Sequence, residues 1–171
     1  MKFTNRAMRF CYYNEAFPRY SQPRKGFAVM SDITRLGSYQ LRPIGIVRST
    51  LKRREDCPHQ GWGAPDATLE IDPAFVEGLD GIVPGCEVIL LTWFHESQRE
   101  VLKVHPQGNP DNPLRGVFAT RSPDRPNPIG LHRVVVDEIE GKGRIRVHPL
   151  EVLDGTPLID IKPVLPGVAD A

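Results

Sequence analysis

The sequence lacks the cysteine pairs and the long apolar runs that mark secreted and membrane proteins. Its 171 residues include three cysteines, Cys11, Cys57 and Cys86, which are widely spaced and form no CxxC pair. Such a set argues against a disulfide framework or a zinc cluster and favours a reducing compartment. No apolar run approaches the roughly 20 residues of a membrane helix, and no apolar segment follows the basic N-terminus as in a secretory signal. We therefore expect a cytoplasmic protein without a membrane segment.

Metal ligands are also not evident from the sequence. His95, His105, His132 and His148 are not spaced like the ligand sets of zinc sites. We therefore expect a protein that works without a metal.

Charge is distributed unevenly along the chain. Residues 1–30 hold six Lys and Arg against one acid, Glu15, whereas the rest of the chain has 16 basic and 20 acidic residues. A basic arm on a mildly acidic body is suited to contacts with RNA phosphates, and it is equally consistent with a solvated extension. We expect a basic extension over residues 1–39, a folded domain over 40–166 and a short tail over 167–171.

Proline is abundant and helix patterns are scarce. The 17 prolines are about twice the usual share, and proline interrupts helices and central strands. One short helix is predicted over residues 74–79, with Asp72 as its N-cap and Gly78 and Gly81 ending it. Strand patterns cover residues 44–49, 68–71, 87–94, 101–104, 116–120, 132–140, 144–150 and 158–161. The fold class predicted is mainly β, a small β-barrel of about seven short strands with little helix.

Three polar loops follow apolar strands and are candidates for a site. The loop 57–63 offers glycines for close backbone approach and two hydrogen-bonding side chains, and the loop 94–96 ends in His95 and Glu96; both are also explained as ordinary strand ends. The turn 120–131 combines three prolines with Arg121, Arg125 and Asn127. A rigid turn lowers the entropy cost of holding a ligand, and a guanidinium can grip a carboxylate with two parallel hydrogen bonds. This turn is the strongest candidate.

The residues of this turn resemble a known signature. The segment 116–131, GVFATRSPDRPNPIGL, is similar to the signature of the TsaA-like family, and the match continues in 153–163, LDGTPLIDIKP, and in 43–49, PIGIVRS. The resemblance covers about residues 41–166. Where this chain has Pro58-His59-Gln60 and His95-Glu96, the family often shows Pro-Arg-Gln and His-Gln.

The resemblance implies a small β-barrel that forms homodimers and holds S-adenosylmethionine in a cleft near the dimer interface. It also implies methylation of N6 of threonylcarbamoyladenosine beside the anticodon of a tRNA. On this basis we expect substrate contacts from Arg125, Asn127 and Thr156. Cofactor contacts are expected from Pro58, His59, Gln60, His95, Glu96, Arg121, Leu131, Pro149, Leu150 and Glu151.

Methyl transfer to this nitrogen also needs a base, because the nitrogen carries a proton. A base must lie within hydrogen-bond reach of that proton, and the catalytic candidates are His95 and Asp154, with Glu96 behind them. Arg121 is expected to hold either the methionine carboxylate of the cofactor or an RNA phosphate. Two other functions stay open: a non-catalytic barrel that binds tRNA or a nucleotide, and a methyltransferase with a different adenosine or small-molecule acceptor.

Overall fold

The computed structural model describes residues 40–58, 63–141, 143–165 and 167. The expected basic extension lies outside the described residues, as do His59, Gln60 and all of the expected tail except Gly167. The predicted domain boundaries therefore stay predictions.

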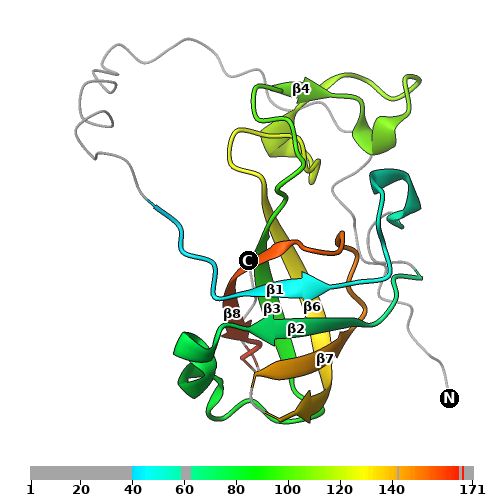
Figure 1. The fold of residues 1–171 in the computed structure, drawn as a ribbon. Coiled ribbons are helices and arrows are strands. Elements are labelled where there is room, and N and C mark those ends of the chain that lie inside the picture. The colour runs from blue at the N-terminus through cyan, green and yellow to red at the C-terminus, as the bar shows by residue number, and fades with distance from the viewer. Residues whose placement is uncertain (1–39, 59–62, 142, 166, 168–171) are drawn as a thin grey trace, which may run out of the picture. The chain divides into compact units, whose positions relative to one another are not determined.

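Six antiparallel strands close into a barrel, which confirms the predicted fold class (Figure 1). Their order around the barrel is β1-β2-β7-β6-β3-β8, and β1 closes it against β8 through the pairs Gly45↔Leu158 and Ile46↔Pro157. The strands are β1 (Gly45–Arg48), β2 (Ala67–Ile71), β3 (Glu87–Trp93), β6 (Ile129–Glu140), β7 (Arg144–His148) and β8 (Pro157–Pro163).

The connection from β3 to β6 carries two more strands, β4 (Lys103–Val104) and β5 (Arg115–Gly116), which pair as a small hairpin. Two short 3-10 helices, η5 (Pro106–Gly108) and η6 (Val117–Ala119), lie in the same connection. Figure 1 shows that this excursion extends beyond the end of the barrel where β3 ends and β6 begins. Its two ends are held together, because the Phe94 N–H donates to the Pro128 carbonyl at 2.8 Å.

The predicted strand over residues 116–120 is wrong beyond its first residue. Only Arg115–Gly116 is extended and paired, and η6 follows at once. The backbone N–H and the hydroxyl of Thr120 both donate to the Val117 carbonyl, at 3.1 and 3.0 Å. These local bonds close a tight turn in place of a strand ladder, as threonine side chains often do.

The predicted short helix is confirmed as the 3-10 helix η4 (Pro73–Leu79), and a further one, η2 (Arg54–Asp56), precedes Cys57. The Ala74 N–H donates to Oδ1 of Asp72 at 2.8 Å, so the predicted N-cap is also confirmed. Gly78 does not end the helix, which continues to Leu79.

The barrel interior is apolar along most of its length because the strands alternate inward and outward side chains. Along β6 the buried positions are every second residue from Gly130 to Val136. None of the helices in the described ranges is long and apolar enough to span a membrane. The core consists of Val47, Ala67, Leu69, Ile71, Val88, Leu90, Val134, Val136, Ile145, Val147, Leu150, Val152 and Leu158.

Candidate functional site

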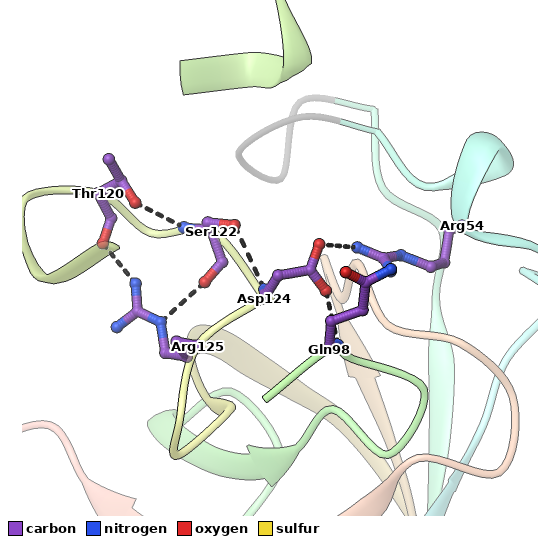
Figure 2. Close-up of polar contacts among 6 residues, drawn as sticks. All are labelled: Arg54, Gln98, Thr120, Ser122, Asp124 and Arg125. Carbon is purple, nitrogen blue, oxygen red and sulfur yellow. Dashed lines mark hydrogen bonds and ion pairs between the residues drawn. The ribbon is translucent and has the colours of Figure 1, made fainter. Parts of the chain in front are cut away.

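The turn between η6 and β6 is built around the side chain of Arg125. Its Nε donates to the Ser122 carbonyl at 2.8 Å, and its Nη2 donates to the carbonyls of Val117 at 3.0 Å and Thr120 at 2.5 Å. Figure 2 shows this guanidinium folded back onto its own turn. Hydrogen bonds from a charged group are stronger than neutral ones, so Arg125 fixes the shape of the turn. Its predicted contact with a substrate stays a prediction.

Arg121 lies in the same turn and is exposed. It makes no hydrogen bond or ion pair with any other residue in the described part of the chain, and its positive charge acts on His132. The rigid turn therefore presents one guanidinium whose donors are available for a ligand.

His132 lies on the inward-facing side of β6, four residues after the turn, and is 8% exposed. Its Nε2 is 3.0 Å from Oγ1 of Thr92, and its ring meets the ring of Phe94 edge to face at 5.8 Å. Burial, together with the charge of Arg121, lowers the pKa of His132 to about 4. The imidazole is therefore neutral at pH 7, and it is a buried hydrogen-bonding group rather than a second cation beside Arg121.

Gly130 makes room for this arrangement. A Cβ at this position would collide with Oγ1 of Thr92, Nε2 of His132 and the ring of Phe94. The sequence patterns did not single out His132. The position of His132 two residues after Gly130, in a strand that alternates buried and exposed residues, could have indicated that its side chain is buried.

Two other loops meet the turn at Asp124. Its Oδ2 accepts a hydrogen bond from Nη2 of Arg54 at 2.9 Å, and its Oδ1 accepts one from the Gln98 N–H at 2.9 Å (Figure 2). Burial alone would raise the pKa of Asp124, but the bonds from Arg54 and Gln98 outweigh it and hold the pKa below its usual value. The carboxylate is therefore ionised and joins three segments that are distant in the sequence.

The joined loops carry several predicted cofactor residues. His95 and Glu96 lie in the turn that follows β3, both exposed, with Nε2 of His95 3.9 Å from Oε1 of Glu96. Pro58 follows Cys57, whose pKa is raised by burial and then by the nearby charge of Glu151. Glu151, in the segment after β7, therefore lies near Cys57. The predicted cofactor contacts of Pro58 and Glu151 stay predictions.

Asp154 is held by contacts with the loop after β1. Its Oδ1 accepts the Ser49 N–H at 3.0 Å, and its Oδ2 lies 2.9 Å from Nζ of Lys52. The hydrogen bond from Lys52 and then that from Ser49 lower the pKa of this carboxyl. A carboxylate stabilised in its charged form is a weak proton acceptor. The predicted catalytic roles of His95 and Asp154 stay predictions.

Asp154 also lines an open cavity of about 370 Å³ together with Arg48, Lys52, Asp66 and Arg146. The three cations are each paired with a carboxylate, of Glu70, Asp154 and Glu138 respectively.

The remaining predicted contact residues differ in exposure. Leu150 and Thr156 are each 1% exposed, so the structure gives their side chains a packing role. Pro149 and Asn127 are exposed, and Leu131 is 46% exposed on the outer face of β6. None of these predicted ligand contacts is tested by the geometry, and they stay predictions.

Among the residues that the structure describes, one group of possible metal ligands comes together that the sequence spacing did not reveal. Ligand atoms of Asp66, Asp137 and His148 lie within 4.8 Å of one another, and Nδ1 of His148 is 2.6 Å from Oδ1 of Asp137. Asp137 lies on β6 and His148 on the paired strand β7, and Asp66 directly precedes β2, which pairs with the other side of β7. Exposed carboxylates near a histidine form ion pairs without a metal, and the expectation of a metal-free protein stays a prediction.

Comparison with known proteins finds relatives that match most of this chain. It is 43% identical over 130 residues to the S-adenosyl-L-methionine-binding protein of Archaeoglobus fulgidus, covering 75% of this chain and 91% of the relative. It is 52% identical over 129 residues to a "Probable S-adenosyl-L-methionine-binding protein" of Pyrococcus horikoshii, covering 73% of this chain and 82% of the relative.

A solved crystal structure shares the fold of this chain. The crystal structure of TrmO from Pseudomonas aeruginosa is 37% identical and superposes with a TM-score of 0.63, covering 80% of this chain. The chain spans 61% of the length of that protein. The family described as the tRNA-methyltransferase O N-terminal domain matches residues 46–170, which include the turn around Arg121 and all strands of the barrel except Gly45, the first residue of β1. The chain belongs to the family of tRNA-methyltransferase O N-terminal domains.

Proposed function

We propose that this protein is an S-adenosylmethionine-dependent methyltransferase that acts in the cytoplasm on N6 of threonylcarbamoyladenosine, next to the anticodon of a tRNA. The observation that carries the proposal is the exposed Arg121 on a turn that Arg125 holds rigid, at the point where three loops meet. A guanidinium can hold an anion there with two parallel, charge-assisted hydrogen bonds. The methionine carboxylate of the cofactor is such an anion.

The names of the relatives support the cofactor. Two relatives that match most of the folded domain are described by their binding of S-adenosylmethionine. Transfer of a methyl group from the sulfonium is an in-line displacement, so the main task of the protein is to hold the cofactor and the acceptor in line. A preorganised turn and a closed barrel are suited to this task because neither has to be ordered when the ligands bind.

The acceptor nitrogen loses a proton in the reaction. When bound, S-adenosylmethionine would supply the methyl group to N6 and be left as a neutral thioether, and a base of this chain would take the N6 proton. We assign this base to His95, which lies beside Glu96 in the turn after β3. Glu96 is placed to stabilise the imidazolium that forms, because opposite charges at this separation attract each other.

The proposed acceptor rests on the family, described as tRNA-methyltransferase O. Mass spectrometry of tRNA nucleosides from a strain without this gene, and from the same strain with the gene restored, tests it. Loss of methylated threonylcarbamoyladenosine and its return on restoration are the expected results. Cofactor binding without this change would indicate a different acceptor, and tRNA binding without cofactor binding would indicate a non-catalytic module.

A homodimer is part of the same proposal. Light scattering at micromolar protein should give twice the 19.2 kDa of one chain. The mass of a monomer under these conditions would contradict it.

A further inference from the structure

Asp124 is the point at which three loops of the candidate site are joined. The carboxylate lies in the turn 120–128, and each of its oxygens accepts a hydrogen bond from a different loop. Arg54 comes from η2, after β1, and Gln98 comes from the segment after β3. Each of the three joined residues lies within four positions of an expected cofactor contact. Arg54 precedes Pro58, Gln98 follows His95 and Glu96, and Asp124 follows Arg121.

The junction lies outside the core of the barrel. Its core is a cluster of apolar residues inside the six strands, and Asp124 is not among them. The turn itself is held by the three bonds from Arg125 to backbone carbonyls. The side chains of Arg54 and Asp124 are 43% and 21% exposed, and ion pairs with this exposure add little to the free energy of unfolding.

The junction does fix the loops relative to one another. The Gln98 N–H and the Arg54 guanidinium bind to the two oxygens of one planar carboxylate, so movement of either loop away from the turn breaks a charge-assisted hydrogen bond. A site assembled from separate loops binds more weakly when the loops must be ordered on binding.

We propose that Asp124 is a positioning residue, which assembles the cofactor site by joining the loops of Arg54 and Gln98 to the turn that carries Arg121. This inference rests on the proposed function for its effect on affinity. Asp124 has no direct contact with the cofactor in this role.

A graded set of variants of the full chain tests the proposal. Asp124→Asn keeps an acceptor for Gln98 and removes the charge that binds Arg54, and Asp124→Ala removes both links. Arg54→Gln should match Asp124→Asn, and Arg54→Lys should recover most of the affinity, because only one guanidinium nitrogen contacts the carboxylate. Calorimetry with S-adenosylmethionine should show about tenfold weaker binding for Asp124→Asn and weaker binding again for Asp124→Ala.

Glu138→Gln is the matched control, because it removes an ion pair to Arg146 of the same 2.9 Å length. Glu138 lies on β6 nine residues from Ile129, roughly 30 Å along the strand from the turn. The melting temperatures of the control and of Asp124→Asn should differ from that of the wild type by no more than about 4 °C, and the control should bind the cofactor normally.

Hydrogen exchange separates failure of this inference from failure of the proposed function. The Gln98 amide should exchange faster in Asp124→Ala than in the wild type, with or without cofactor. Slow exchange together with wild-type affinity in Asp124→Ala would overturn the positioning role. If the wild type itself does not bind S-adenosylmethionine, the proposed function fails, and the exchange rate still decides whether Asp124 joins the loops.

Discussion

Arg121 and Arg125 lie four positions apart in one turn and have opposite surroundings. The guanidinium of Arg125 donates to the carbonyls of Val117, Thr120 and Ser122. That of Arg121 is exposed and contacts no described partner by hydrogen bond or ion pair. Both were candidates for ligand binding in the sequence. The structure indicates that one builds the turn and that the turn presents the other.

Arg121→Lys should separate the binding roles of Arg121. It keeps the charge and loses the planar fork, so we expect a folded protein that binds S-adenosylmethionine at least about tenfold more weakly, equivalent to about 1.4 kcal/mol. Calorimetry measures this. If Arg121 holds an RNA phosphate instead, cofactor affinity should stay constant while tRNA affinity falls and becomes less dependent on salt. Unchanged stability, cofactor binding and methylation would remove Arg121 from the site.

Arg125→Lys should act on stability as well as on binding. A single ammonium group cannot reach three carbonyls that a guanidinium spans. We expect a loss of about 1–3 kcal/mol in the free energy of unfolding, measured by urea denaturation, together with weaker cofactor binding. Loss of tRNA binding at wild-type stability would show instead that Arg125 contacts the substrate, as the sequence predicted.

His132 should make the protein less stable in acid. Its pKa is lowered from 6.5 to about 4 by burial and by Arg121, so the unfolded chain binds a proton at a higher pH than the folded one does. The stabilising effect is complete above pH 6.5 and is lost as the pH falls from 6.5 to 4, by an amount on the order of 3 kcal/mol.

Two measurements check this expectation for His132. Denaturation at several pH values should show a smaller decrease between pH 6.5 and 4 in His132→Gln than in the wild type. If this variant does not fold, NMR titration of the wild-type imidazole gives the pKa directly. A value near 6.5 would contradict the burial argument.

The choice of base can be decided by comparing two variants. His95→Gln should lower kcat by about 100-fold or more, the usual contribution of a general base. Asp154→Asn should lower kcat less than about tenfold, because the carboxyl of Asp154 is already held by Ser49 and Lys52 and its pKa is lowered. Single-turnover assays with tRNA measure both. The opposite ranking would return the role of base to Asp154.

Metal removal should leave cofactor binding unchanged. The group of possible ligands formed by Asp66, Asp137 and His148 is outside the junction at Asp124. Calorimetry with S-adenosylmethionine before and after treatment with a chelator should therefore give the same affinity. Binding that disappears with the chelator and returns with zinc would contradict the expectation of a metal-free site. His148→Ala would then show whether these ligands hold the metal.

The fold could be predicted from the sequence because strand alternation and proline distribution are local signals. The N-cap of η4 at Asp72 is read in the same way. Residues 116–120 were misjudged because the hydrogen bonds of Thr120 to Val117 compete with strand pairing. The role of Asp124 could not be predicted from the sequence. It depends on Arg54 and Gln98, which are distant from Asp124 in the sequence and come close to it only in the folded chain. Candidate polar residues within one turn could be predicted from the sequence, whereas hydrogen bonds between separate loops could not.

The excursion between β3 and β6 has a consequence for how this domain diversifies. The two strands are paired from Glu87↔Val135 to Trp93↔Ile129, and the Phe94 to Pro128 bond ties the base of the excursion. Insertions, deletions or grafts within residues 95–127 therefore start and end at a fixed separation and need not repack the barrel. The barrel should therefore tolerate exchange of this whole segment, whereas cofactor binding would require the new segment to bring its own equivalents of His95, Arg121, Asp124 and Arg125.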